Sequence, residues 1–315
     1  MRGFDVITMG RVGVDLYPLE RGSLVDVKYF QKFLGGSPTN VAVAVARLGE
    51  RSAVITRTGH DPFGDYVIAA LRGFGVDDRF VSQVPGLQTP VTFCELFPPD
   101  HFPIYFYRQP TAPDLEIYAA ELDLAAIHSA RLLWATVSGL SVEPSRSATI
   151  AALSSRERRS LTVLDLDFRP TFWHSVDEVG TVVRSALRYA TVAVGNVAEV
   201  EAAVGTTEPD AAADRLLELG VNLVIVKLGP AGVLAKSCDE RLEVQAKPIN
   251  VVNGLGAGDA FGGALCHGLL AGWSLLKTVT FANAAGAIVA SRLSCSEAMP
   301  TVNEIEELLE RAPRA

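Results

Sequence analysis

Short apolar runs alternate along the chain with longer segments whose apolar residues recur every three or four positions. The short runs, which predict buried strands, are residues 4–9, 52–57, 131–137, 160–165, 191–195 and 222–228. The longer segments, which predict helices, include residues 38–48, 61–72, 144–153, 176–189, 198–203, 210–219, 264–270, 273–290 and 302–310. Strand–helix alternation implies a parallel sheet covered on both faces by helices. The pattern therefore predicts an α/β fold in a single domain over residues 1–315.

Two of the helix starts are marked by a polar residue followed by proline. In Ser37-Pro38 and in Asp61-Pro62, a capping side chain precedes a residue that needs no N–H in the first turn. Both pairs therefore predict the first residues of a helix.

Two segments break the strand–helix rhythm. Residues 12–34 are mainly polar with scattered aromatic side chains, and residues 89–112 contain two strand-like runs joined by a turn with two prolines. The aromatic residues of the second segment do not follow helical spacing. We expect the two segments to form a small β-structured lid on the α/β body.

Composition and charge exclude several kinds of partner. Hydrophobic residues make up 49% of the chain, enough for a large core, and the net charge of −8 argues against nucleic acid and anionic membranes. The four cysteines are far apart and form no C-x-x-C pair, so we expect free thiols in a reducing compartment. The first residues lack a signal-peptide layout and no apolar run is long enough to cross a bilayer. We expect a soluble cytoplasmic protein.

A glycine-rich stretch at residues 253–263 carries the clearest chemistry. Gly254, Gly256 and Gly258 leave room for several backbone N–H groups to converge where a helix begins, and the dipole of that helix favours an anion. Asp259 stands beside these groups. Such an arrangement suits phosphoryl transfer, with the N–H groups of Gly256, Ala257 and Gly258 holding developing charge and Asp259 taking the proton of the acceptor hydroxyl. The alternative is that Asp259 only caps the helix.

The G-A-G-D sequence and its small-residue helix resemble the second signature of the ribokinase-like (PfkB) carbohydrate kinases. The first signature of that family is matched by Gly35, Gly36, Asn40, Ala42, Gly49 and Gly59. The resemblance implies a ribokinase-like three-layer α/β/α sandwich with a mainly parallel central sheet, and transfer of the γ-phosphate of ATP with Mg²⁺. Residues 8–18, 102–108 and 253–259 are also similar to actinobacterial 5-dehydro-2-deoxygluconokinases, the kinases of myo-inositol breakdown.

On the sugar side, the resemblance implies that Asp15 accepts hydrogen bonds from sugar hydroxyls. It also implies that Gly35, Gly36 and Asn40 let the sugar approach the backbone and bind an amide. Two arginines, Arg108 and Arg169, suit the carboxylate of an acidic sugar, because a guanidinium binds a carboxylate through two parallel hydrogen bonds. The alternative is that each forms a structural ion pair with one of the nearby acids, Asp114, Asp165 or Asp167.

On the nucleotide side, the resemblance places Lys227, Gly229 and Gly232 in a turn near ribose and phosphate, and Asn283 beside adenine. Asn196 and Glu199 match an N-x-x-E motif whose residues lie on one face of a helix start and hold Mg²⁺ through water. The family pattern has an aspartate where this chain has Asn253, so activation by potassium is left open. The five histidines show no ligand spacing.

These observations favour an ATP-dependent kinase whose acceptor is an acidic keto sugar, 5-dehydro-2-deoxy-D-gluconate, and which pairs through its lid as a homodimer. The alternatives are a 2-dehydro-3-deoxygluconokinase, a fructokinase, or a catalytically silent regulator that binds a sugar or nucleotide. A Rossmann dehydrogenase is disfavoured because no G-x-G-x-x-G follows the first strand. The chain also has no G-K-[ST] sequence of a P-loop kinase.

Overall fold

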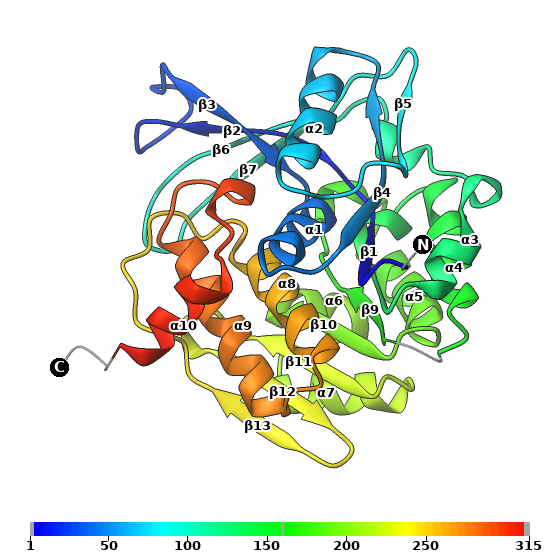
Figure 1. The fold of residues 1–315 in the computed structure, drawn as a ribbon, viewed down its shortest axis with the longest axis vertical. Coiled ribbons are helices and arrows are strands. Elements are labelled where there is room, and N and C mark those ends of the chain that lie inside the picture. Colours follow the sequence, from blue (N-terminus) through cyan, green and yellow to red (C-terminus); the bar gives the residue numbers. More distant parts are fainter. Residues whose placement is uncertain (1–2, 159–160, 312–315) are drawn as a thin grey trace.

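The computed structural model describes residues 3–158 and 161–311 (Figure 1). Within these residues, nine strands form the central sheet in the order β13-β12-β11-β10-β9-β8-β1-β4-β5. Its strands are β1 (Val6–Met9), β4 (Ser52–Gly59), β5 (Val81–Val84), β8 (Leu132–Thr136), β9 (Leu161–Asp165), β10 (Val192–Asn196), β11 (Leu223–Lys227), β12 (Val233–Ser237) and β13 (Arg241–Val244). All neighbouring strands are parallel except β11–β12 and β12–β13. The first residue of the predicted strand 160–165 lies outside the described residues.

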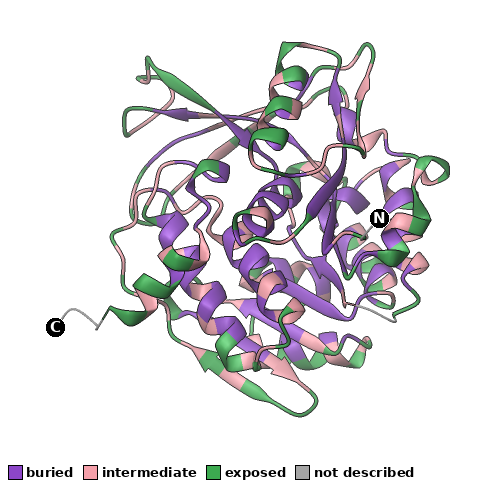
Figure 2. Ribbon diagram, in the orientation of Figure 1, coloured by how far each residue is buried: buried purple, intermediate pink, exposed green. Residues whose placement is uncertain are grey.

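Helices cover both faces of this sheet, as the buried interior in Figure 2 shows. One face packs against α1 (Ser37–Arg47), α2 (Pro62–Gly73), α8 (Ala257–Leu270), α9 (Leu275–Ala290) and α10 (Val302–Glu310). The other packs against α3 (Leu124–Ser129), α4 (Ser145–Ser155), α5 (Val176–Leu187), α6 (Val197–Val204) and α7 (Pro209–Glu218). Strand β1 illustrates this burial on both sides. Val6 belongs to the hydrophobic core on the first face of the sheet and Ile7 to the core on the other face.

The lid is a second sheet of four strands in the order β3-β2-β6-β7. Its strands are β2 (Gly13–Pro18), β3 (Phe30–Gly35), β6 (Val91–Cys94) and β7 (Ile104–Tyr107). They come from the two segments predicted to form the lid, and β3 runs one residue past the predicted limit at residue 34. Figure 1 shows this sheet projecting from the edge of the body. Aromatic rings from three of its strands, Phe30, Phe93 and Tyr107, contact one another edge to face.

The structure differs from the predicted elements in a few places. The hairpin β12–β13, strand β5 and helix α3 were not predicted. Strands β5 and β13 and helix α3 are short, partly exposed and weakly patterned, whereas β12 is a buried apolar run of only three residues that follows the glycine turn directly. Asp61 caps α2 as predicted, accepting a hydrogen bond from the N–H of Gly64. Ser37 does not cap α1, since the helix already includes it and Gly36 is the capping residue. Among the described helices, none is both long and apolar enough to cross a bilayer.

Candidate active site

The predicted site residues gather where the carboxyl ends of the parallel strands meet the lid and the start of α8. In open α/β sheets, ligands bind in the crevice at this end of the strands. A cavity there is lined by residues from β2, the start of α1, the lid, the loop after β9 and the glycine loop. Its lining residues are Arg11, Asp15, Tyr17, Gly36, Ser37, Asn40, Thr92, Ile104, Phe106, Arg169, Leu255, Gly256, Asp259 and Cys295.

A larger cavity of about 280 Å³ lies at strands β4 and β5, away from the glycine loop. Its arginine Arg57 already pairs with Glu121 and donates to Ser82. Helix α3 begins at this cavity, but its N-cap Asp123 accepts a hydrogen bond from the N–H of Ala126. The chemistry therefore points to the cavity beneath the lid.

Helix α8 begins in a way that leaves its first N–H groups open. Gly256 is the capping residue with a φ of 80°, and no side chain accepts from the N–H groups of the first turn. A Cβ on Gly256 would lie 2.5 Å from Sγ of Cys295, so only glycine fits this position. The preceding loop is held by Asn253, whose Oδ1 accepts from the N–H of Leu255 and whose Nδ2 donates to the carbonyl of Leu293. The helix start is thus an open anion site.

Asp259 lies in the first turn of α8 and does not cap the helix. Its Oδ2 accepts a hydrogen bond of 2.8 Å from Nδ2 of Asn40. The amide of Asn40 is oriented in turn by Ser296, whose hydroxyl lies 2.7 Å from Oδ1. Burial raises the pKa of Asp259, although the bond from Asn40 opposes the shift. Asn40, which was predicted to bind the sugar, therefore lines the cavity and also orients the carboxylate of Asp259.

Asp15 faces the same cavity from β2. It is 8% exposed, and Oδ2 accepts from the hydroxyl of Tyr17 at 3.1 Å. Burial raises the pKa of Asp15 to about 6, against the attraction of Arg11 and the bond from Tyr17. A Cβ on Gly35 would collide with the Asp15 carboxylate, so Gly35 makes room for Asp15, whereas Gly36 lines the cavity itself.

The two arginines predicted to bind an acidic sugar are placed differently. Arg169 lines the cavity, and its Nη2 pairs with Oδ1 of Asp167 at 2.8 Å. Nη2 of Arg108 instead pairs at 2.6 Å with Oδ1 of buried Asp114, which also accepts from the N–H of Val12. Arg108 does not line the cavity. The ion pair that was the alternative is therefore present for both arginines, and only Arg169 also lines the cavity.

A second cluster of polar residues lies at the carboxyl ends of β10 and β11. Asn196 and Glu199 cap α6 reciprocally, each side chain accepting from the backbone N–H of the other. Nζ of Lys227 lies 3.9 Å from Oε2 of Glu199 and would be 3.2 Å from a Cβ on Gly258, so this lysine is beside the start of α8. Its pKa is raised: burial favours the neutral amine, and the carboxylates of Glu199 and Asp165 outweigh that effect.

The oxygen donors near Lys227 suit a magnesium ion. Glu199 and Asp165 are buried carboxylates, and carboxylate oxygen is a ligand that Mg²⁺ prefers. No cluster of three or more His, Cys, Asp or Glu residues with metal-binding geometry occurs in the described part of the chain. Asn196 and Glu199 remain the predicted residues for a metal held through water.

The remaining nucleotide-side residues lie outside the cavity beneath the lid. Gly229 and Gly232 turn the chain between β11 and β12 with φ values of 58° and 101°. Asn283 on α9 donates to the carbonyl of Gln245. Gly254 packs near Phe102 of the lid, since a Cβ there would lie 3.0 Å from that ring. The roles of these residues toward ATP stay predictions.

The cavity wall also contains residues to which the sequence analysis assigned no role, among them Arg11, Tyr17 and Cys295. Arg11 directly follows Gly10 at the end of the first strand, and a charged residue at the carboxyl end of a buried strand is a usable signal. Cys295 lies far along the chain from Tyr17, yet Sγ of Cys295 is 2.8 Å from the hydroxyl oxygen of Tyr17. No local pattern announces that contact.

Comparisons with known proteins agree with this geometry. Residues 4–302 match the family model described as pfkB family carbohydrate kinase. The 5-dehydro-2-deoxygluconokinase of Photobacterium profundum is 34% identical to this chain, over 98% of this chain and 96% of that protein. The 5-dehydro-2-deoxygluconokinase of Clostridium perfringens is 30% identical, over 98% of this chain and 94% of that protein. A protein described as ribokinase II from E. coli, in complex with ATP and Mg²⁺, has a TM-score of 0.89 at 25% identity, over 98% of this chain and 100% of that one. A fructokinase from Vibrio cholerae bound to fructose, ADP and calcium has a TM-score of 0.85 at 28% identity, over 98% and 99%.

Proposed function

The chain belongs to the PfkB family of carbohydrate kinases, and from this premise we propose that it transfers the γ-phosphate of ATP to the primary hydroxyl of an acidic keto sugar. The acceptor that we propose is 5-dehydro-2-deoxy-D-gluconate, whose phosphorylation is a step of myo-inositol breakdown. The ribokinase-like fold and the kinase family predicted from the sequence are confirmed.

One observation carries the proposal: an uncapped helix start and two carboxylates, buried Asp15 and half-buried Asp259, face one cavity. The N–H groups at the start of α8 provide a site for phosphate, with Lys227 beside them. Asp259 borders the cavity at that end, and Asp15 borders it from the lid. A phosphate donor and a sugar acceptor can therefore meet at Asp259.

Each group then has a chemical role. Asp259 accepts the proton of the attacking hydroxyl, for which its raised pKa is suited. Because the transition state of phosphoryl transfer is loose, a strong base is not required. The backbone N–H groups of Gly256, Ala257 and Gly258 hold the charge that develops on the transferred group. Mg²⁺, when bound near Glu199, neutralises phosphate charge during the transfer.

The acidic acceptor is supported by the guanidinium of Arg169 in the cavity wall. A guanidinium matches a carboxylate in a way that a neutral sugar does not require. The relatives named 5-dehydro-2-deoxygluconokinase, similar over nearly the whole chain, point the same way. The alternatives are 2-dehydro-3-deoxygluconate and fructose, the second supported by the likeness to a fructokinase.

A phosphorylation panel tests the proposal. The purified protein is assayed with ATP and Mg²⁺ against 5-dehydro-2-deoxygluconate, 2-dehydro-3-deoxygluconate, fructose and ribose, with ADP release as the readout. We expect the highest kcat/KM for 5-dehydro-2-deoxygluconate. A higher value for fructose or ribose would refute the acidic acceptor, and no ADP release with any sugar would favour a silent regulator.

We further propose a homodimer that pairs through the lid, in the cytoplasm. Tyr29 and Tyr107 are each 66% exposed on this sheet, and β7 is one of its edge strands. The four free cysteines suit a reducing compartment. Sedimentation should give a dimer mass for the wild type and a monomer for Tyr107→Glu. A monomeric wild type at micromolar concentration would contradict the pairing.

A further inference from the structure

Arg11 reaches the sugar cavity from the turn that follows β1. Its backbone carbonyl accepts from the hydroxyl of Thr39 at 3.2 Å, which fixes the turn against α1. Its side chain is 13% exposed, and the guanidinium carbon lies 5.6 Å from the ring centre of Phe106 on the lid. The side chain is therefore held between the body and the lid, at the cavity wall.

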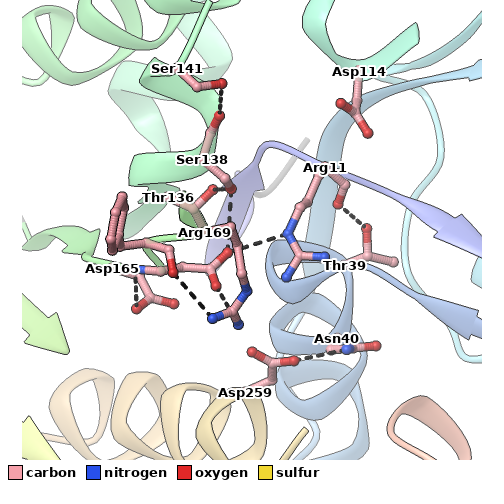
Figure 3. Close-up of polar contacts among 12 residues, drawn as sticks. Arg11, Thr39, Asn40, Asp114, Thr136, Ser138, Ser141, Asp165, Arg169 and Asp259 are labelled. Carbon is pink, nitrogen blue, oxygen red and sulfur yellow. Dashed lines mark hydrogen bonds and ion pairs between the residues drawn. The ribbon is translucent and has the colours of Figure 1, made fainter. Parts of the chain in front are cut away.

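Arg11 and Arg169 share one counter-ion. Nε of Arg11 lies 3.3 Å from Oδ2 of Asp167, and Nη2 of Arg169 lies 2.8 Å from Oδ1 of the same carboxylate. Arg169 has a second, longer contact to an acid, since its Nη1 lies 3.8 Å from Oε1 of Glu199. Figure 3 shows Arg11 and Arg169 approaching each other above Asp259 and Asn40. Two guanidinium groups thus line one wall with a single carboxylate between them.

The terminal nitrogens of Arg11 remain available. Within residues 3–158 and 161–311, its only side-chain hydrogen bond is the one from Nε, and neither Nη makes one. Asp15 and Asp259 attract the guanidinium from across the cavity without bonding to it. Arg108 is the contrast: its side chain is 8% exposed, pairs with Asp114 and stacks 4.5 Å from the centre of the Phe172 ring.

We propose that Arg11 is a specificity-determining residue that binds the carboxylate of the acidic sugar through its Nη groups, with Arg169 as the second donor. The inference rests on the proposed function, since it needs an acidic acceptor. Asp167 positions both guanidiniums without occupying the edge of Arg11 that the ligand uses. A carboxylate between two arginines forms the charge-assisted, paired hydrogen bonds that lysine does not reproduce.

The test compares Arg11→Gln and Arg11→Lys with wild type on two substrates, 5-dehydro-2-deoxygluconate and neutral fructose. For Arg11→Gln, we expect kcat/KM for the acid to fall about 100-fold, mainly through KM, because the lost contact is remote from the reacting hydroxyl. Fructose, which has no carboxylate, should lose less than about tenfold, because it loses only the attraction that Arg11 exerts on Asp15 and Asp259. Arg11→Lys keeps the positive charge but lacks the paired N–H donors of a guanidinium, so its kcat/KM for the acid should fall about tenfold. Thermal melting checks that each variant is folded. If Arg11→Gln does not fold, the comparison of the two substrates is made with Arg11→Lys alone.

Arg108→Gln is the matched arginine control. It breaks a buried ion pair, so we expect a lower Tm and a similar proportional change on both substrates. Equal losses on acid and neutral sugar for the Arg11 variants, or no loss on the acid, would overturn the inference while leaving the proposed function intact. A wild type that prefers fructose would overturn both, because no carboxylate would then need to be bound.

Discussion

Replacing Asp15 by asparagine should make the protein more stable and less active. Burial raises the pKa of Asp15 from 3.8 to about 6, so the folded state disfavours the charged form. A pKa raised on folding gives stability that is present at low pH and is lost as the pH rises through the folded-state pKa. A difference of about two units corresponds to about 3 kcal/mol lost above pH 7.

Asparagine resembles the protonated acid and does not titrate, so the variant escapes this loss. We expect Asp15→Asn to exceed wild type in free energy of unfolding by about 1.5 kcal/mol at pH 5 and about 3 kcal/mol at pH 7.5. Urea unfolding at both pH values measures the difference. In the kinase assay the same variant should lose about 100-fold in kcat/KM, because a charged acceptor for sugar hydroxyls is gone.

Tyr17→Phe is the matched control, since it keeps the carboxylate and removes the hydroxyl that donates to it. This variant should be destabilised more at pH 7.5 than at pH 5, because the bond stabilises the charged form. A pH-independent difference between Asp15→Asn and wild type, or a less stable variant at pH 7.5, would refute the claim that burial of this charge opposes folding.

Two further predictions concern the base and the core. Asp259→Asn should fold with a Tm near that of wild type and lose about 10³-fold in kcat, since the acceptor proton has no base; a near-wild-type kcat would remove Asp259 from the mechanism. Arg156 is fully buried, has no carboxylate partner within residues 3–158 and 161–311, and donates to the carbonyls of Ile127, Ala130 and Leu161, among others. Arg156→Leu should cost about 3–5 kcal/mol in urea unfolding, because several buried acceptors lose a charged donor, and a cost below about 1 kcal/mol would contradict this role.

Most of the fold could be predicted because its signals are local. The buried parallel strands are continuous apolar runs, and helices such as α10 show their period and their cap within ten residues. Edge elements gave weaker signals: β13 alternates between exposed and half-buried residues, and its end lies against Gly232, where a Cβ would collide with the carbonyl of Val244. The lid was recognised only as an interruption of the strand–helix rhythm.

The candidate site was predicted less evenly. Glycine positions and Asp259 lie in one continuous stretch, so their spacing, together with the family resemblance, indicated a phosphate site at a helix start. For Arg108 and Arg169 the sequence offered nearby acids as alternative partners, and the pairs with Asp114 and Asp167 are present, but it indicated no partner for Arg11. Arg108 pairs with Asp114, six residues away, whereas Arg11 meets Asp167 across 156 positions.

What the sequence determined by itself is the α/β alternation, the glycine loop with its aspartate, and the family to which these belong. Only the tertiary structure decided which charges share the cavity. Strands β1, β8 and β9 are neighbours in the sheet, so their carboxyl ends bring Arg11 to Asp167 and Arg169. The physical reason is that a salt bridge depends on distance in space and on burial, and sheet order sets both between residues that are remote along the chain.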